Sequence, residues 1–131
     1  MEEILDDIPG ATELFSWFGY WPSFHDAEIV SLTLNRIGVS TLQVYAYHMT
    51  NELDDRGYYV LEKHVHVNFR MEEIFSLELF DFNLQNVIFG LILSRVEEGF
   101  EIKLDPCSGM SGTVASKRLS IDFHPVPEPL D

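Results

Sequence analysis

Residues 58–71 carry the feature that most constrains the fold, an alternation of apolar and polar side chains. A period of two places successive side chains on opposite faces of a β-strand and does not suit a helix. The side chains expected to face the core are Tyr59, Leu61, Val65, Val67, Phe69 and Met71, and those expected to face away are Glu62, His64, His66, Asn68 and Arg70. This segment therefore predicts a strand with one buried face.

Other segments show strand patterns too, and the connections between them are short and contain Gly, Asn or Asp. Parallel strands need crossovers of about a dozen residues, so these strands are expected to pair antiparallel. The further predicted strands are residues 28–34, 41–50, 74–82, 87–96, 100–105 and 113–124. The fold class expected is mainly β (α+β), an antiparallel sheet of about seven strands. A sandwich and a partial barrel both fit this pattern.

One helix is expected near the N-terminus. Residues 11–18 place Leu14, Phe15 and Phe18 on one helical face, and Gly19 suits the helix end. A chain of 131 residues, of which 46% are hydrophobic, fits a single domain spanning 1–131. The acidic residues 1–10 and the proline-rich residues 125–131 are expected to be loosely ordered ends.

The sequence favours a cytoplasmic location. Cys107 is the only cysteine, which excludes an internal disulfide, and the acidic N-terminus lacks the features of a secretory signal. The longest uncharged apolar run, residues 87–93, is far shorter than the roughly 20 residues that a membrane helix needs.

The net charge of −14 restricts the classes of partner. Phosphate backbones and anionic membrane surfaces attract basic proteins, so no nucleic acid and no membrane is expected to bind. A basic protein is the partner that such a field attracts, with association that weakens as salt rises. The alternative is that the acidity only keeps the protein soluble.

Two groups of side chains suggest chemistry. His64 and His66 form a pair on one strand, and with His48 and the carboxylate of Glu62 they resemble the metal ligands of a cupin-like barrel enzyme. A solvated outer face explains the same residues without metal, so the expectation is no metal and no cofactor. The metal-dependent β-barrel enzyme using His64 and His66 is kept as the alternative function.

The second group is His25, Asp26 and Glu28, which lie where a proline-containing turn enters a strand. Two carboxylates and a histidine are able to bind a cation or transfer protons. No nucleophile elbow or phosphate-binding loop accompanies them, and the turn around Cys107 and Ser108 fits neither motif. We therefore expect partner binding or a structural role here, and no catalytic residue.

Three patches, in this order along the chain, resemble the immunity protein 50 family of bacterial polymorphic toxin systems. The patches are Trp-Pro-Ser-Phe-His-Asp-Ala-Glu at residues 21–28, Asn-Leu-Gln-Asn-Val-Ile-Phe-Gly at 83–90 and Asp-Pro-Cys-Ser-Gly at 105–109. The last of them departs from the family pattern at Cys107. The resemblance implies a small, mostly β protein, not an enzyme, that binds and neutralises a cognate toxin by occlusion.

The partner-binding candidates combine acidic and aromatic side chains from four parts of the chain. They are Trp21, His25, Asp26, Glu28, Glu52, Asp54, Asp55, Tyr58, Tyr59, Glu72 and Glu73. Aromatic side chains flanked by charge often anchor protein interfaces, which is why the two tyrosines are included. A homo-oligomer formed through an edge strand is a further possibility that this fold class allows.

Overall fold

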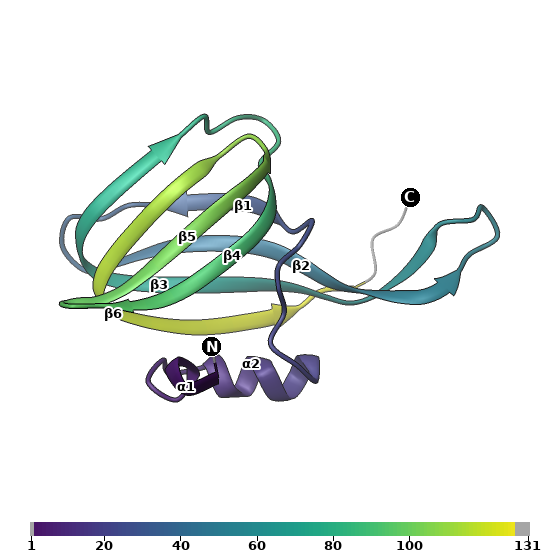
Figure 1. Ribbon diagram of the computed structural model, residues 1–131, viewed down its shortest axis with the longest axis horizontal. Coiled ribbons are helices and arrows are strands. Elements are labelled where there is room, and N and C mark those ends of the chain that lie inside the picture. Colours follow the sequence, from purple (N-terminus) through teal and green to yellow (C-terminus); the bar gives the residue numbers. More distant parts are fainter. Residues whose placement is uncertain (1, 128–131) are drawn as a thin grey trace.

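The strands form one antiparallel sheet that closes on itself into a ring (Figure 1). The computed structural model describes residues 2–127. The elements are α1 (Glu2–Leu5), α2 (Ala11–Phe18), β1 (Glu28–Thr33), β2 (Val39–Leu53), β3 (Tyr59–Phe80), β4 (Val87–Val96), β5 (Gly99–Ser108) and β6 (Ser111–Pro125). Neighbours follow the order β1-β2-β3-β6-β5-β4, and Glu28 of β1 pairs with Val87 of β4 to close the ring. The mainly β, antiparallel fold with a short helix at residues 11–18 is confirmed.

The sheet has six strands because two expected strands, 58–71 and 74–82, belong to the single strand β3. Glu73 adopts a φ of 57°, and the register with β6 shifts between Ile74 and Ser76. A β-bulge of this kind bends a strand and increases its twist without ending it. Glu72 and Glu73, which separate the two expected strands in the sequence, therefore mark a bend within β3.

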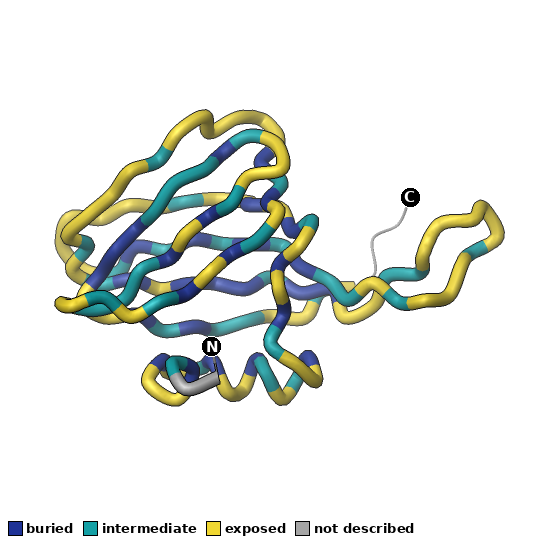
Figure 2. The backbone as a smooth tube through the Cα atoms, in the orientation of Figure 1, coloured by how far each residue is buried: buried dark blue, intermediate teal, exposed yellow. Residues whose placement is uncertain are grey.

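The core is a single cluster of apolar side chains from the strands and both helices. In the middle of β3, Val65, Val67, Phe69 and Met71 are fully buried, as the alternation predicts (Figure 2). Tyr59 is 54% exposed, contrary to its expected place in the core. The first residues of β3 pair only with the end of β2, in a hairpin that projects beyond the ring, so no core lies beside them (Figure 1).

The described N-terminal residues pack against the core, whereas the sequence predicts a loosely ordered end over residues 1–10. Leu5, Ile8, Leu14 and Phe18 are all at most 3% exposed. Their spacing of three or four residues, continued by Ala11, forms one apolar stripe across α1 and α2. Met1 lies outside the described residues. None of the helices in residues 2–127 has the length and apolar character needed to cross a membrane.

The C-terminal segment is also partly docked. Pro125 ends β6 opposite Val65, and the backbone N–H of Val126 donates to the carbonyl of His64 at 2.9 Å. The sequence predicts a loosely ordered end over residues 125–131, and residues 125 and 126 contact β3 in the structure. Residues 128–131 lie outside the described part of the chain.

Candidate functional site

The segment Trp21–Ala27 forms the turn that leads into the closure of the ring. Pro22 and Phe24 are buried, and the Phe24 ring lies 5.7 Å from that of Phe69 between centroids. Trp21 is half-buried, with its ring centroid 5.9 Å from that of Phe24. Trp21 therefore serves packing first and offers only part of its surface to a partner.

The three patches that carry the family resemblance meet at this closure. The backbone N–H of Asp26 donates to the carbonyl of Ile88 at 2.9 Å, and that of Ile29 donates to the carbonyl of Asn86 at 2.8 Å. The third patch joins them through β5, because Val87 pairs with Ser108 and Ile88 with Pro106. Just beyond that patch, the backbone N–H of Met110 donates at 3.0 Å to the side-chain Oδ1 of Asn86, a residue that is 3% exposed. Because buried polar groups need partners, these bonds give all three patches a structural role.

His25, Asp26 and Glu28 do not form one cluster with a shared ligand. His25 Nδ1 lies 3.2 Å from Asp26 Oδ2, and the His25 ring packs edge-on against Phe89 with a centroid distance of 4.9 Å. His25 and Glu28 are both exposed. Glu28 also lines a groove beside the ring closure. The arrangement offers carboxylates and an exposed aromatic surface to a partner.

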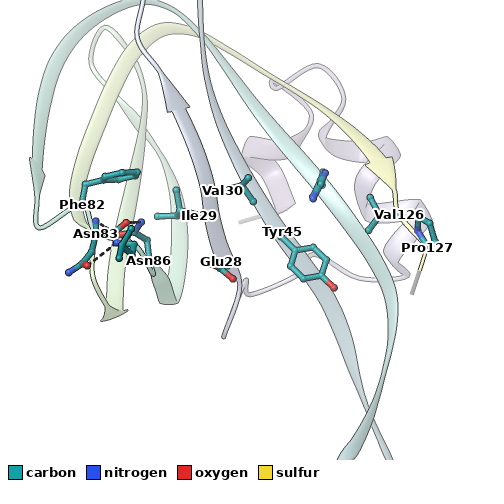
Figure 3. Close-up of a pocket in the computed structure, with 11 residues that line it drawn as sticks. Glu28, Ile29, Val30, Tyr45, Phe82, Asn83, Asn86, Val126 and Pro127 are labelled. Carbon is teal, nitrogen blue, oxygen red and sulfur yellow. Dashed lines mark hydrogen bonds between the residues drawn. The ribbon is translucent and has the colours of Figure 1, made fainter. Parts of the chain in front are cut away.

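A groove of about 620 Å³ crosses the outside of the sheet beside the ring closure (Figure 3). Tyr45 and Glu28 lie in its middle, with the β3–β4 loop at one side and the C-terminal segment at the other (Figure 3). Its lining residues are Glu28, Ile29, Val30, Tyr45, His66, Phe82, Asn83, Leu84, Asn86, Val126 and Pro127. The groove combines large apolar side chains with a carboxylate, which suits an apolar and cationic ligand segment.

Tyr45 and His66 line this groove, and Tyr45 also contacts His64. A hydrogen bond of 2.5 Å joins its hydroxyl to Nδ1 of His64, and the two rings stack with an interplanar angle of 16°. The ring of His66 packs edge-on against Tyr45 at 5.8 Å. Burial raises the pKa of the Tyr45 hydroxyl above its ordinary value.

His64 is only 7% exposed, although the sequence places it on the outer, solvated face of β3. Among the described residues its buried Nε2 atom has no hydrogen-bond partner. The stacked ring of Tyr45 and the C-terminal segment, which bonds the His64 carbonyl, both lie next to it. Its burial therefore comes from neighbours that are distant in sequence.

The histidines of the metal alternative are not gathered. The register shifts between Ala46 and His48, where β3 contains one extra residue, and Lys63 there has a φ of 54°. His48 consequently pairs with Glu62 and shares the face of buried Ala46, opposite the face of Tyr45 and His64. Its Nδ1 atom is hydrogen-bonded at 2.6 Å to the hydroxyl of Tyr20. Within residues 2–127, no group of three or more His, Cys, Asp or Glu is positioned to hold a metal ion.

The tip of the β2–β3 hairpin gathers five of the predicted partner-binding residues, Glu52, Asp54, Asp55, Tyr58 and Tyr59. Asp54 Oδ1 accepts from the backbone N–H groups of Arg56 and Tyr58 at 2.9 and 3.0 Å. The bond from Tyr58 is the main cause that holds the pKa of Asp54 below its ordinary range. Tyr58 is 66% exposed and Tyr59 54% exposed, so both are accessible.

Glu72 and Glu73 lie elsewhere and are paired within the molecule. Arg118 donates to Glu72 Oε2 at 2.9 Å and lies 2.7 Å from Glu73 Oε2. Hydrogen bonding to Glu72 and the charge of Glu73 raise the pKa of Arg118. The distance along β3 from Tyr59 to Glu72 is roughly 40 Å at about 3.3 Å per residue. The structure therefore does not join these two glutamates to the hairpin surface.

Sequence reasoning missed the apolar part of the groove. Leu84 is 101% exposed and Phe82 is 62% exposed, and both belong to a short loop that is otherwise polar. Large apolar side chains in a polar loop were the available signal, because an exposed apolar patch marks an interaction surface. Val30, which is 47% exposed, lines the same groove from β1.

No family model matches the chain, and neither a curated protein nor a solved structure is significantly similar to it.

Proposed function

We propose that this protein is an immunity-type binding protein that neutralises a cognate bacterial toxin by covering it. Its acidic surface meets a basic region of the toxin, and no bond is made or broken. The observation that carries the proposal is a net charge of −14 combined with exposed aromatic side chains on a projecting hairpin. Complementary potentials of this kind accelerate association and select cationic partners.

Four of the eight Lys and Arg side chains are engaged with neighbouring groups of the protein. Arg118 is held by Glu72 and Glu73, Arg70 lies 3.6 Å from Asp122, and Arg95 is paired with Asp7. Lys63 donates to the carbonyl groups at the end of α2, at 2.8 Å for Phe18. These cations are engaged locally, while Glu52 and Asp55 at the hairpin tip are exposed.

The hairpin offers the features of an interface anchor. Tyr58 and Tyr59 are rigid, half-exposed aromatic groups, and Leu53 beside them is 61% exposed. Aromatic side chains surrounded by polar groups often provide most of the binding energy at protein interfaces. The resemblance of residues 21–28, 83–90 and 105–109 to the immunity protein 50 family supports the same function.

The proposal is tested by co-expression with the product of the adjacent gene in a bacterial host. We expect growth to be rescued and the two proteins to purify as a complex. A double variant, Glu52→Lys with Asp55→Lys, should lose protection, because it reverses the charge at the hairpin tip.

The matched control is Glu97→Lys with Glu98→Lys, which makes the same change of charge in the exposed β4–β5 turn. This turn lies at the other end of the molecule from the hairpin (Figure 1). The control should keep its protection. Failure of the unaltered protein to rescue growth and to form a complex would refute the proposed function. Equal loss in both double variants would show that net charge acts without a defined contact surface.

A further inference from the structure

The second half of β3 is paired on one side only. The strand β2 pairs with β3 from Tyr59 to Glu72, and its register ends there. Beyond this point β6 alone pairs with β3, from Ile74 to Phe80. In the part of the chain that the structure describes, Ile74–Phe80 is therefore a free sheet edge of seven residues, long enough to template another strand.

Large apolar side chains on this edge are partly exposed. Leu77 is in register with Val114 of β6, so the two side chains point to the same face of the sheet. Val114 is 2% exposed, whereas Leu77 is 42% exposed. Phe75 and Phe80 are 41% and 56% exposed. An added strand would bury apolar surface that the ring leaves open.

Two of the devices that proteins use to block such an edge are absent from it, while the bulge between Ile74 and Ser76 and the charge of Glu78 are present. Proline and lysine on an edge strand prevent pairing with another chain, and Ile74–Phe80 contains neither. No Lys or Arg occurs between Arg70 and Arg95. The charges of this region are negative, and Glu78 and Asp81 are exposed.

These charges decide which strand fits. Glu78 is the carboxylate within the edge itself, since Glu73 is paired with Arg118 and Asp81 follows the end of the strand. A strand that carries Lys or Arg would meet this carboxylate and the negative net charge of the protein. The edge therefore favours a cationic strand.

We propose that the edge Ile74–Phe80 receives an extended segment of the protein partner in which apolar residues alternate with Lys or Arg. Backbone hydrogen bonds along the edge supply affinity, and the alternation supplies specificity. The same segment continues toward Phe82 and Leu84, whose loop follows the edge and forms one side of the groove. This inference rests on the proposed function for the identity of the partner, but the chemistry of the edge is testable without it.

The test uses synthetic peptides and the intact protein. The probe is a peptide of about ten residues that alternates lysine and valine, long enough to cover a seven-residue edge. A peptide alternating glutamate and valine controls for charge, and a lysine–valine peptide with a central proline controls for strand formation. Binding is measured by amide hydrogen exchange and chemical-shift changes, residue by residue.

We expect the lysine–valine peptide to slow exchange of amides within Ile74–Phe80. The glutamate–valine and proline-containing peptides should bind at least about tenfold more weakly. Glu78→Lys should weaken binding of the lysine–valine peptide by about fivefold or more, whereas Glu97→Lys, with the same change of net charge, should alter it less than about twofold.

The inference would be overturned by no protection at the edge, by protection confined to the hairpin tip, or by equal binding of the lysine and glutamate peptides. A concentration-dependent dimer with protection of the same amides in the free protein would assign the edge to a second copy, and would overturn it as well. Peptide binding at the edge together with no complex in the co-expression experiment would leave the edge established and refute the proposed partner. A complex in the co-expression experiment without peptide binding at the edge would support the immunity function and refute strand addition.

Discussion

The two halves of β3 belong to one strand but have different surroundings. From Val65 to Met71 the strand lies between β2 and β6, and its inward side chains are fully buried. From Ile74 onward it has β6 on one side only, and the inward-facing Leu77 is 42% exposed. Each half carries large apolar side chains on its inward face. The comparison teaches that the neighbours of a strand, and not its own pattern, decide whether its apolar face belongs to the core or to an interface.

Matched truncations in the two halves give the largest expected difference. Met71→Ala removes a fully buried side chain and should lower the free energy of unfolding by about 2–5 kcal/mol. Leu77→Ala removes a side chain that is 42% exposed and should lower it by about 1 kcal/mol or less. Urea denaturation of both variants measures this. Equal losses would mean that the second half of β3 is as well packed as the first.

A change at Gly112 should act on the second half alone. Gly112 has a φ of 132°, and a Cβ atom there would lie 1.9 Å from the carbonyl oxygen of Glu78. Gly112→Ala should therefore cost about 1–3 kcal/mol through backbone strain. It should also weaken the pairing with β6, the one strand that pairs with Ile74–Phe80 in the described chain. Amide exchange should accelerate there more than in Val65–Met71, and a uniform acceleration would contradict this reading.

The smallest effect concerns the hairpin tip, which is ordered by local hydrogen bonds and not by the core. Because the pKa of Asp54 is lowered in the folded protein, its ionised form stabilises the turn above the ordinary value of 3.8. That contribution is lost as pH falls through the lower, folded value. The amide shifts of Arg56 and Tyr58 should titrate below pH 3.8, and Asp54→Asn should abolish this without changing the global unfolding midpoint. A titration at or above 3.8 would contradict the bonded geometry.

The sequence predicts the regular parts of this molecule well. Period two in residues 58–71 and helical spacing in residues 11–18 identify the strand and the helix that the structure contains, because both patterns are local. The docking of α1 also left a signal, the apolar stripe from Leu5 to Phe18. Acidic residues interrupt this stripe, so the composition of the N-terminus does not reveal it.

The sites depend on irregularities that local patterns do not encode. One extra residue at Lys63 separates His48 from His64, and the bend at Glu73 joins two expected strands. Closure of the ring, the groove and the free edge of β3 all follow from pairings between segments far apart in the chain. Of the eleven predicted partner-binding residues, five gather at the hairpin, while Glu72 and Glu73 pair with Arg118.

The most direct test of the central claim is the affinity of the purified protein for the product of the adjacent gene, measured by calorimetry at low and at high salt. If an acidic surface captures a basic protein, the dissociation constant should rise by at least about tenfold between about 0.05 and 0.5 M salt. An affinity that does not change with salt would contradict electrostatic capture.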